Sequence, residues 1–340
     1  MTDIASTTKS VLVTGGAGYI GSHVVLALLE AGHKVVVVDN LATGFREAIP
    51  PSVPLVVGDI GDRALLRGVI RDHRCQSVMH FAASVVAPQS VSEPIAYYQN
   101  NLLNTANLVN ACIDECVSNL VFSSTAAIYG LAPGGVVSEI SPCVPISPYG
   151  RSKLACEWIL EDVARVSGLR YMALRYFNVA GADPDLRVGQ RTKYATHLIK
   201  VACEAALGMR SKVEVFGSDY PTTDGTGVRD YIHVHDLGAA HLAALKHLES
   251  GGESLTLNVG YGRGYSVREV IDAVQRVSGV SITVDVAPRR PGDPPMIVAD
   301  ATKIRASLDW TPRLQDIDVI IKHSWLWQRK LRDEASATRT

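Results

Sequence analysis

Hydrophobic and polar positions alternate regularly along the first half of the chain. Short runs of β-branched and other apolar residues predict strands at 11–14, 34–39, 55–57, 77–80, 120–123 and 171–175. Segments with apolar residues three and four positions apart separate most of these runs and predict helices at 20–31, 63–72 and 97–116. Strands and helices in alternation predict a parallel sheet covered by helices on both faces.

The pattern changes after Arg175. Two long polar segments, 181–191 and 217–227, predict loops, and loops of this length usually serve a site. Further on, helices are predicted at 236–248 and 267–277 and strands at 255–259 and 282–286. We therefore expect an α/β fold, with a Rossmann-type doubly wound parallel sheet and a smaller C-terminal α/β substrate-binding domain. The first domain should span 1–178, with returning segments near 229–261, and the second, discontinuous domain should span 179–335.

A glycine-rich turn follows the first predicted strand. Gly15 permits a tight turn, Gly18 lets the backbone approach a pyrophosphate, and Gly21 allows close packing of the following helix. Asp39 ends the second strand, where a carboxylate accepts hydrogen bonds from the adenosine ribose and repels a 2′-phosphate. The alternative for Asp39 is a turn formed with Asn40. The pattern predicts a domain that binds NAD rather than NADP.

A tyrosine and a lysine lie one helical turn apart at Tyr149 and Lys153, so they share one face of a helix. A lysine within roughly 4–6 Å favours the tyrosinate by about 1–3 pKa units, so we expect Lys153 to lower the pKa of Tyr149. The fifth strand carries hydroxyls up to Thr125, at the sheet edge where α/β enzymes bind ligands. Thr125 therefore either binds the oxygen that is oxidised or caps the strand.

Composition limits the possible partners. The chain has 340 residues and a formal net charge of −1, without a block of like charge, so nothing indicates binding to nucleic acid or to a membrane surface. No apolar run has the ~18 residues of a spanning helix, and the first residues do not form a secretory signal. The six cysteines show no CxxC pair. We expect reduced thiols, no metal and a cytoplasmic protein.

Ten stretches carry a resemblance to a known family. They are VLVTGGAGYIGSH, VVDN, GDI, MHFAAS, YYQNN, FSSTAAIYG, SPYGRSKL, LRYFNVAGA, VFGSDYPTTDGTGVRDYIHVHDL and APRRPGDPP. With them the chain resembles the extended short-chain dehydrogenase/reductase family, and within it the 4-epimerases of UDP-sugars. The resemblance implies interconversion of UDP-glucose and UDP-galactose through a 4-keto intermediate, with NAD as cofactor and a UDP-sugar as substrate. It also implies a homodimer formed through the helices near 97–116 and 149–164.

The resemblance implies roles for individual residues. It assigns catalysis to Thr125, Tyr149 and Lys153. It assigns cofactor contacts to Gly15, Gly18, Tyr19, Ile20, Asp39, Asn40, Asp59, Ile60, Phe81, Ala82, Asn100, Tyr149, Lys153 and Tyr176. It assigns substrate contacts to Thr125, Tyr149, Asn178, His197, Phe216, Arg229, Arg290, Asp293 and Ile297. Three of these have further interpretations from the residues alone, because the loop that holds Asp59 could cap a helix and Arg229 and Arg290 could be surface residues.

Some positions depart from the pattern of the best-known bacterial members. Val85 replaces a lysine that often contacts the cofactor, and His197 replaces an asparagine. Ile297 occupies a position where a bulky tyrosine restricts the sugar pocket and a smaller residue admits N-acetyl sugars. UDP-N-acetylglucosamine and UDP-pentoses are therefore alternative substrates.

Alanines follow Thr125 at positions 126 and 127, where related dehydratases carry an acid that could expel water. This favours epimerisation. A net oxidoreductase and a non-catalytic NAD sensor are the remaining alternatives, and the sensor would not need the Tyr149–Lys153 pair. His233 and His235 alternate on what could be a strand, but no third metal ligand is evident.

Overall fold

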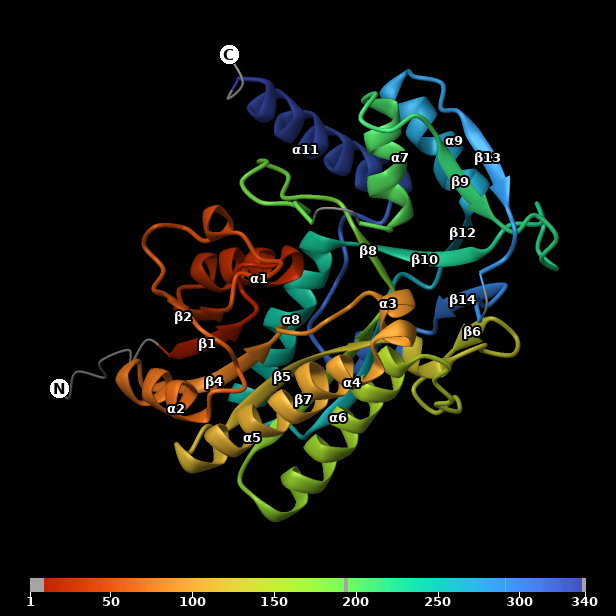
Figure 1. The fold of residues 1–340 in the computed structure, drawn as a ribbon. Helices are drawn as coiled ribbons and strands as arrows, with labels where there is room; N and C mark the ends of the chain where they lie inside the picture. The colour runs from red at the N-terminus through yellow and green to blue at the C-terminus, as the bar shows by residue number, and fades with distance from the viewer. Residues whose placement is uncertain (1–8, 193–194, 291, 338–340) are drawn as a thin grey trace.

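A seven-stranded parallel sheet forms the centre of the protein in the computed structural model, which describes residues 9–192, 195–290 and 292–337 (Figure 1). The strand order is β11-β7-β5-β4-β1-β2-β3, and each neighbouring pair is parallel. The strands are β1 (Ser10–Thr14), β2 (Lys34–Asp39), β3 (Leu55–Val57), β4 (Cys75–His80), β5 (Asn119–Thr125), β7 (Arg170–Tyr176) and β11 (Leu255–Val259). This order is that of the Rossmann fold, as predicted.

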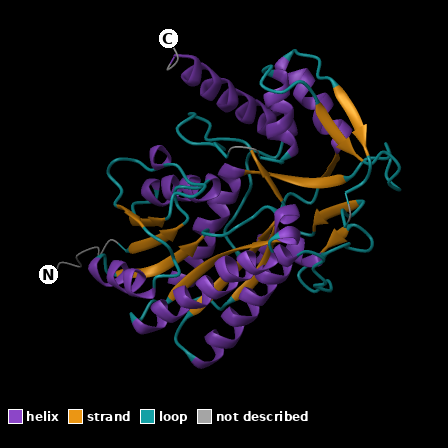
Figure 2. Ribbon diagram, in the orientation of Figure 1, coloured by secondary structure: helices purple, strands orange, loops and turns teal. Residues whose placement is uncertain are grey.

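Helices cover both faces of this sheet, which explains why its strands are apolar throughout rather than alternating. Val11, Val13 and Val37 pack on one face with α1 (Tyr19–Glu30) and α8 (Val234–Glu249). Leu12, Val36 and Val38 pack on the other face, which is covered by α2 (Arg63–Asp72), α5 (Asn104–Asp114) and α6 (Pro148–Val166). Figure 2 shows the two helical layers on either side of the strands.

Most predicted boundaries of the first half hold within one or two residues, and β2, β3 and α2 match their predictions at both ends. The helix predicted at 97–116 is not one regular helix. It consists of α4 (Pro94–Tyr97), a π-helical stretch at Tyr98–Leu103 and α5, with the short helix α3 (Ala87–Ser92) before it. Stretches of π-helix are frequent at functional sites, and this one carries Asn100.

The second half of the chain, together with β6 from the first half, builds a second sheet. Its order is β12-β10-β14-β6, and β8 pairs with the last residues of β10, Tyr231 to His233. These strands are β6 (Val136–Val137), β8 (Asn178–Ala180), β10 (Val228–His233), β12 (Gly264–Ser266) and β14 (Met296–Ala299). A separate pair joins β9 (Val213–Phe216) to β13 (Val284–Ala287), beside the mutually packed helices α7 (Leu198–Ala206), α9 (Val267–Ser278) and α11 (Ile317–Ala337). Short helices complete the fold at Arg46–Ala48, Ala126–Tyr129 and Thr302–Ser307.

The segments near 229–261 divide between the two sheets. After β10 in the second sheet, the chain passes through α8 on the face of the first sheet and then adds β11 beside β7. The division into two domains at residue 178 stays a prediction. In the part of the chain that the structure describes, no helix combines the length and the apolar character needed to cross a membrane.

Candidate functional site

The turn between β1 and α1 requires its glycines. Gly15 has a φ of +70°, and a Cβ there would lie 2.4 Å from the Ala82 nitrogen. A Cβ on Gly21 would lie 2.3 Å from the Gly15 carbonyl oxygen. Gly18 is the N-cap of α1, and no side chain bonds the first amides of that helix. The turn therefore presents free backbone N–H groups and the positive end of a helix dipole, which suit a pyrophosphate.

Asp39 lies at the carboxyl end of β2 and is buried. Its carboxylate accepts hydrogen bonds from the backbone nitrogens of Ala17, at 2.9 Å, and Leu41, at 2.8 Å. Burial raises the pKa of this carboxyl, and the two backbone bonds oppose that shift. Each carboxylate oxygen retains a further lone pair. Asp39 thus holds the glycine turn and forms the local turn with Leu41, and it can still accept a ribose hydroxyl.

Asp59 follows β3 and is exposed. It accepts hydrogen bonds from the Gly61 nitrogen at 2.7 Å and from the side-chain amide of Asn104 at 3.1 Å. The N-cap of α2 is Asp62, whose side chain accepts from the Leu65 nitrogen at 3.0 Å. The N-cap role that was the alternative for this loop therefore belongs to Asp62 and not to Asp59.

The other predicted cofactor residues lie around the same edge of the sheet. Phe81 and Ala82 follow β4, and both backbone nitrogens donate to the Thr14 carbonyl oxygen. Asn100, in the π-helical stretch, donates to the Ser84 hydroxyl at 2.9 Å. Ile60 is buried, Tyr19 and Ile20 begin α1, Asn40 follows β2, and Tyr176 ends β7. The predicted cofactor residues therefore gather at the carboxyl ends of β1 to β5 and β7, where such sheets bind ligands.

The predicted catalytic residues meet at the end of β5. Ser147 caps α6 through a bond from the Gly150 nitrogen at 3.2 Å, and this places Tyr149 and Lys153 in the first two turns. A hydrogen bond joins the side chains of Tyr149 and Thr125. The Lys153 ammonium donates to the Ser123 carbonyl oxygen at 2.9 Å, and the Ser123 hydroxyl is bonded to that of Tyr176.

The expected lowering of the Tyr149 pKa by Lys153 is wrong for this arrangement. Burial raises the pKa of Tyr149 to about 12, and the bond to Thr125 opposes this rise only in part. Burial also lowers the pKa of Lys153 to about 8, because the ammonium is removed from water. Since the ammonium is bonded to a carbonyl and lies over the Phe122 ring, 4.7 Å from its centre, it is not directed at the phenol alone.

A buried ion pair beneath the catalytic residues was not predicted. Glu157, one turn after Lys153 in α6, pairs with Arg175 in β7 at 2.6 Å and accepts from the Ser124 hydroxyl. Arg175 also donates to the Tyr129 hydroxyl at 3.0 Å, and Tyr129 donates to the Asn258 side chain at 2.6 Å. The sequence did carry a signal for this pair. Arg175 lies inside a largely apolar strand, and a buried charge needs a partner of opposite charge.

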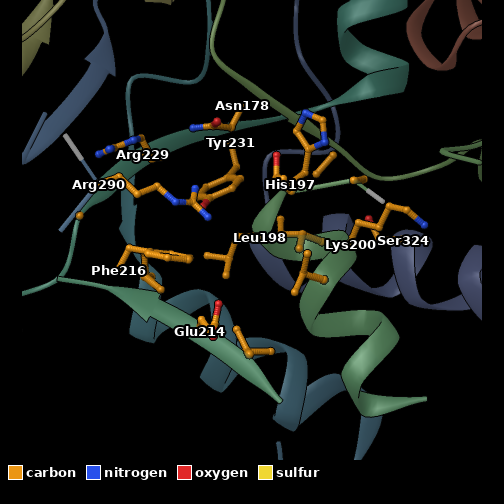
Figure 3. A pocket seen from close by; sticks show the side chains of 18 of the residues that line it. Asn178, His197, Leu198, Lys200, Glu214, Phe216, Arg229, Tyr231, Arg290 and Ser324 are labelled. Carbon is orange, nitrogen blue, oxygen red and sulfur yellow. The ribbon is translucent and has the colours of Figure 1, made fainter. Parts of the chain in front are cut away.

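A cleft of about 730 Å³ lies between β10, α7 and β9. Six of the residues predicted to bind substrate line it, namely Asn178, His197, Phe216, Arg229, Arg290 and Asp293. Figure 3 shows Arg229, Arg290 and Phe216 on one side of this cleft and His197 at the start of α7 on the other. Arg229 pairs with Asp293 at 3.2 Å, and the Arg290 guanidinium lies 3.7 Å from the centre of the Phe216 ring. Two forked cation donors in one cleft suit a diphosphate.

Ile297 lies outside the residues that line this cleft. It stands opposite Arg229 in the pairing of β10 with β14, and it is buried in an apolar cluster that contains Ala126, Tyr129 and Phe177. Because Ala126 directly follows Thr125, the cluster lies next to the catalytic residues.

The two alternating histidines do not share a strand. His233 ends β10, whereas His235 belongs to α8. His233 is buried, and its ring bonds the ring of His323 in α11 at 2.9 Å, a partner that sequence patterns did not indicate. Among the residues that the structure describes, no three His, Cys, Asp or Glu side chains lie close enough together to hold a metal ion.

Comparisons with known proteins agree with this geometry. The model of the NAD-dependent epimerase/dehydratase family matches residues 11–260. A UDP-glucose 4-epimerase of Azospirillum brasilense is 54% identical over 97% of this chain and 95% of that protein. The crystal structure of UDP-glucose 4-epimerase from Brucella ovis in complex with NAD is 43% identical, with a TM-score of 0.91 over 94% of this chain and 98% of that one. The enzyme from Bifidobacterium longum in complex with NAD⁺ and UDP is 37% identical, with a TM-score of 0.90 over 96% and 99%.

Proposed function

The chain belongs to the NAD-dependent epimerase/dehydratase family, and we propose that it is a UDP-sugar 4-epimerase that interconverts UDP-glucose and UDP-galactose. The observation that carries this proposal is the cluster of Tyr149, Thr125 and Lys153 at the carboxyl edge of the first sheet, the same edge that carries the glycine turn. The enzyme is an isomerase, because the sugar leaves with the composition it had on entry.

The glycine turn and Asp39 fit a dinucleotide without further change. Gly15 and Gly21 lack the Cβ atoms that would collide with the turn, so the turn can pack tightly and a ligand can approach the open amides of α1. The Asp39 carboxylate can accept a hydrogen bond from a ribose hydroxyl. When bound, NAD⁺ would accept a hydride and later give it back. Its positively charged nicotinamide ring would also favour an ionised phenol nearby. Asp39 would disfavour the extra phosphate of NADP by charge repulsion.

The cleft would hold the UDP part of the substrate. Arg229 and Arg290 pair with the diphosphate, and Phe216 and Asn178 line the same space. UDP-glucose and UDP-galactose share the same nucleotide. Its binding energy can therefore hold the ligand while the hexose stays loosely bound and rotates between the two hydride transfers.

Proton transfer is assigned to Tyr149. Its oxygen takes the proton of the sugar 4-hydroxyl while C4 loses its hydride, which leaves a ketone at C4. Thr125 bonds the same phenol and orients it, and Lys153 adds positive charge beneath. The hydride then returns to C4 on the opposite face, and the proton returns from Tyr149 to the oxygen on C4. Ala126 and Ala127 carry no group that could expel water, so the ketone has no other exit.

The test replaces Tyr149 by phenylalanine in the NAD-loaded protein. The conversion of UDP-galactose to UDP-glucose should slow by at least ~10²-fold, since the proton acceptor is lost. Tyr171→Phe is the matched control, because Tyr171 lies at the opposite end of β7, and it should retain the wild-type rate. Near-normal turnover by the Tyr149 variant would exclude the assignment, and stoichiometric release of NADH by the wild type would indicate a net oxidoreductase.

The range of sugars is tested with a panel of UDP-hexoses, UDP-N-acetylhexosamines and UDP-pentoses. If N-acetyl sugars are substrates, Ile297→Tyr should depress their turnover selectively, because a larger side chain next to Ala126 leaves less room near the reacting carbons. Equal loss for UDP-galactose would show that Ile297 does not select between sugars.

A homodimer formed through the helices around 97–116 and α6 is also proposed. Apolar side chains on these elements are exposed in the single chain, among them Ile95 at 67%, Leu103 at 56% and Trp158 at 58%. Burial of such side chains favours association. Trp158→Glu should convert a dimer to a monomer in light scattering, and a wild-type monomer would refute the proposal.

A further inference from the structure

The ring of His197 is held by a neighbouring amide. Its Nδ1 lies 3.0 Å from the side-chain amide nitrogen of Gln190. An amide nitrogen can only donate a hydrogen bond, so Nδ1 must accept it. The neutral imidazole then carries its single proton on Nε2, and the bond to Gln190 selects between its two tautomers.

The backbone of Gln190 is itself fixed in place. The residue is buried, with 7% of its surface exposed. Its backbone carbonyl oxygen accepts from the indole of Trp327 at 3.2 Å and from the side-chain amide of Gln328 at 2.9 Å, both in α11. This segment is therefore tied to α11.

The other ring nitrogen is available to a ligand. His197 is an exposed residue of the cleft, and no partner for its Nε2 is found among residues 9–192, 195–290 and 292–337. Crowding by the cleft walls and the charge of Lys200 lower the pKa of the ring, so it is neutral at pH 7 and above. The charged groups that line the same cleft are Lys200, which pairs with Glu204, and Arg210, Lys212, Glu214, Arg229, Arg290 and Asp293.

We propose that Gln190 is a positioning residue that makes His197 a hydrogen-bond donor toward a phosphate oxygen of the nucleotide. Phosphate oxygens only accept, so the tautomer with its proton on Nδ1 would present a lone pair to them and repel them. In the orientation of the structure, the amide nitrogen of Gln190 faces Nδ1 and disfavours that tautomer. This inference rests on the proposed function, because it assumes that the cleft holds a nucleoside diphosphate.

The test exchanges the amide for a carboxylate with Gln190→Glu. A carboxylate accepts from Nδ1, which moves the ring proton to Nδ1 and raises the pKa of His197. At pH 9 the neutral ring of the variant would present its lone pair, and UDP should bind at least ~10-fold more weakly than to the wild type. At pH 6 the imidazolium carries both protons, and the affinity should return to within about 3-fold.

Binding of UDP is measured by calorimetry on the NAD-loaded protein, as the ratio of the variant and wild-type dissociation constants at each pH. The ratio cancels the titration of UDP itself. The control is Gln190→Glu in a His197→Asn background, which keeps the added charge and removes the ring. Its ratio to His197→Asn alone should not change with pH.

A second measurement does not depend on affinity. Nitrogen-15 NMR distinguishes the two imidazole tautomers, and the His197 signal, identified by its loss in His197→Asn, should report the proton on Nε2 in the wild type. The proton on Nδ1 in the wild type, or a flat affinity ratio between pH 6 and 9 for a folded Gln190→Glu, would overturn the inference. If wild-type protein does not bind UDP at millimolar concentration, the proposed function fails instead.

Discussion

Replacing both members of the Glu157–Arg175 pair by methionine should cost less stability than replacing either one. The pair is nearly inaccessible, with 6% and 8% of the two side chains exposed, and three hydrogen bonds of 2.6 to 3.2 Å join them. Burial lowers the pKa of the Arg175 guanidinium, but the hydrogen bonds and the charge of Glu157, together with Tyr129, raise it by more, so the arginine is charged at every accessible pH.

The magnitude follows from what each change leaves behind. Glu157→Met leaves a buried guanidinium without its counter-charge, and Arg175→Met leaves a buried carboxylate, so each should cost about 3–5 kcal/mol. The double variant leaves no charge. Ser124 then loses its acceptor, at about 1–3 kcal/mol, whereas Tyr129 still donates to Asn258. The double variant should therefore be at least about 3 kcal/mol more stable than the sum of the single changes predicts.

Urea unfolding at fixed NAD concentration, followed by circular dichroism, gives the free energies. The exposed pair of Glu161 and Arg165 in the same helix supplies the control, since the corresponding methionine changes there should stay within about 1 kcal/mol. Additive costs at Glu157 and Arg175 would refute the reasoning, because they would show that neither charge depends on the other.

Three further changes test other parts of the structure. Gly21→Ala should weaken NAD binding at least ~10-fold in a titration, because its Cβ would lie 2.3 Å from the Gly15 carbonyl oxygen, whereas Gly68→Ala, with open space around it, should be neutral or stabilising. Because the pKa of Lys153 is about 8 in the folded protein, the unfolded chain binds more protons than the folded one between about pH 8 and 10.5. The free energy of unfolding of the wild type, relative to that of Lys153→Met, should therefore rise with pH in this range. A fall would contradict the burial argument. A thiol reagent should modify the exposed Cys116 first in the native protein. Burial raises the thiol pKa of four other cysteines, which makes them less reactive, namely Cys75, Cys112, Cys156 and Cys203. Cys116→Ser should therefore abolish the fast phase of modification.

Local patterns predicted the first sheet well because most of its strands contain a short run of apolar residues near turn residues. β2 and β3 follow directly from such runs, and α2 follows from apolar residues three and four positions apart. The π-helical stretch at Tyr98–Leu103 could not be predicted, since it depends on contacts made from outside the helix. One of these is the bond that the Asn101 side chain donates to the Ser84 carbonyl oxygen at 2.9 Å.

The candidate site also has a part that local sequence patterns predict and a part that depends on the fold. The glycine turn and the Tyr149–Lys153 pair are sequence-local, so their geometry follows from helix and turn rules. The pKa of Tyr149 is not local, because burial by several elements outweighs the lysine four residues away. Gln190 and His323 were missed for the same reason, since each becomes significant only through a partner brought close by the fold.

The position of β11 has a consequence for synthesis on the ribosome. β7 emerges early, yet the strand that pairs with its outer side is encoded only after residue 254. Until then β7 presents an unpaired edge, and such edges invite pairing with other nascent chains. A truncated chain that ends near residue 180 should therefore aggregate rather than accumulate as a stable fragment, and release of the full-length polypeptide should coincide with the closing of that edge.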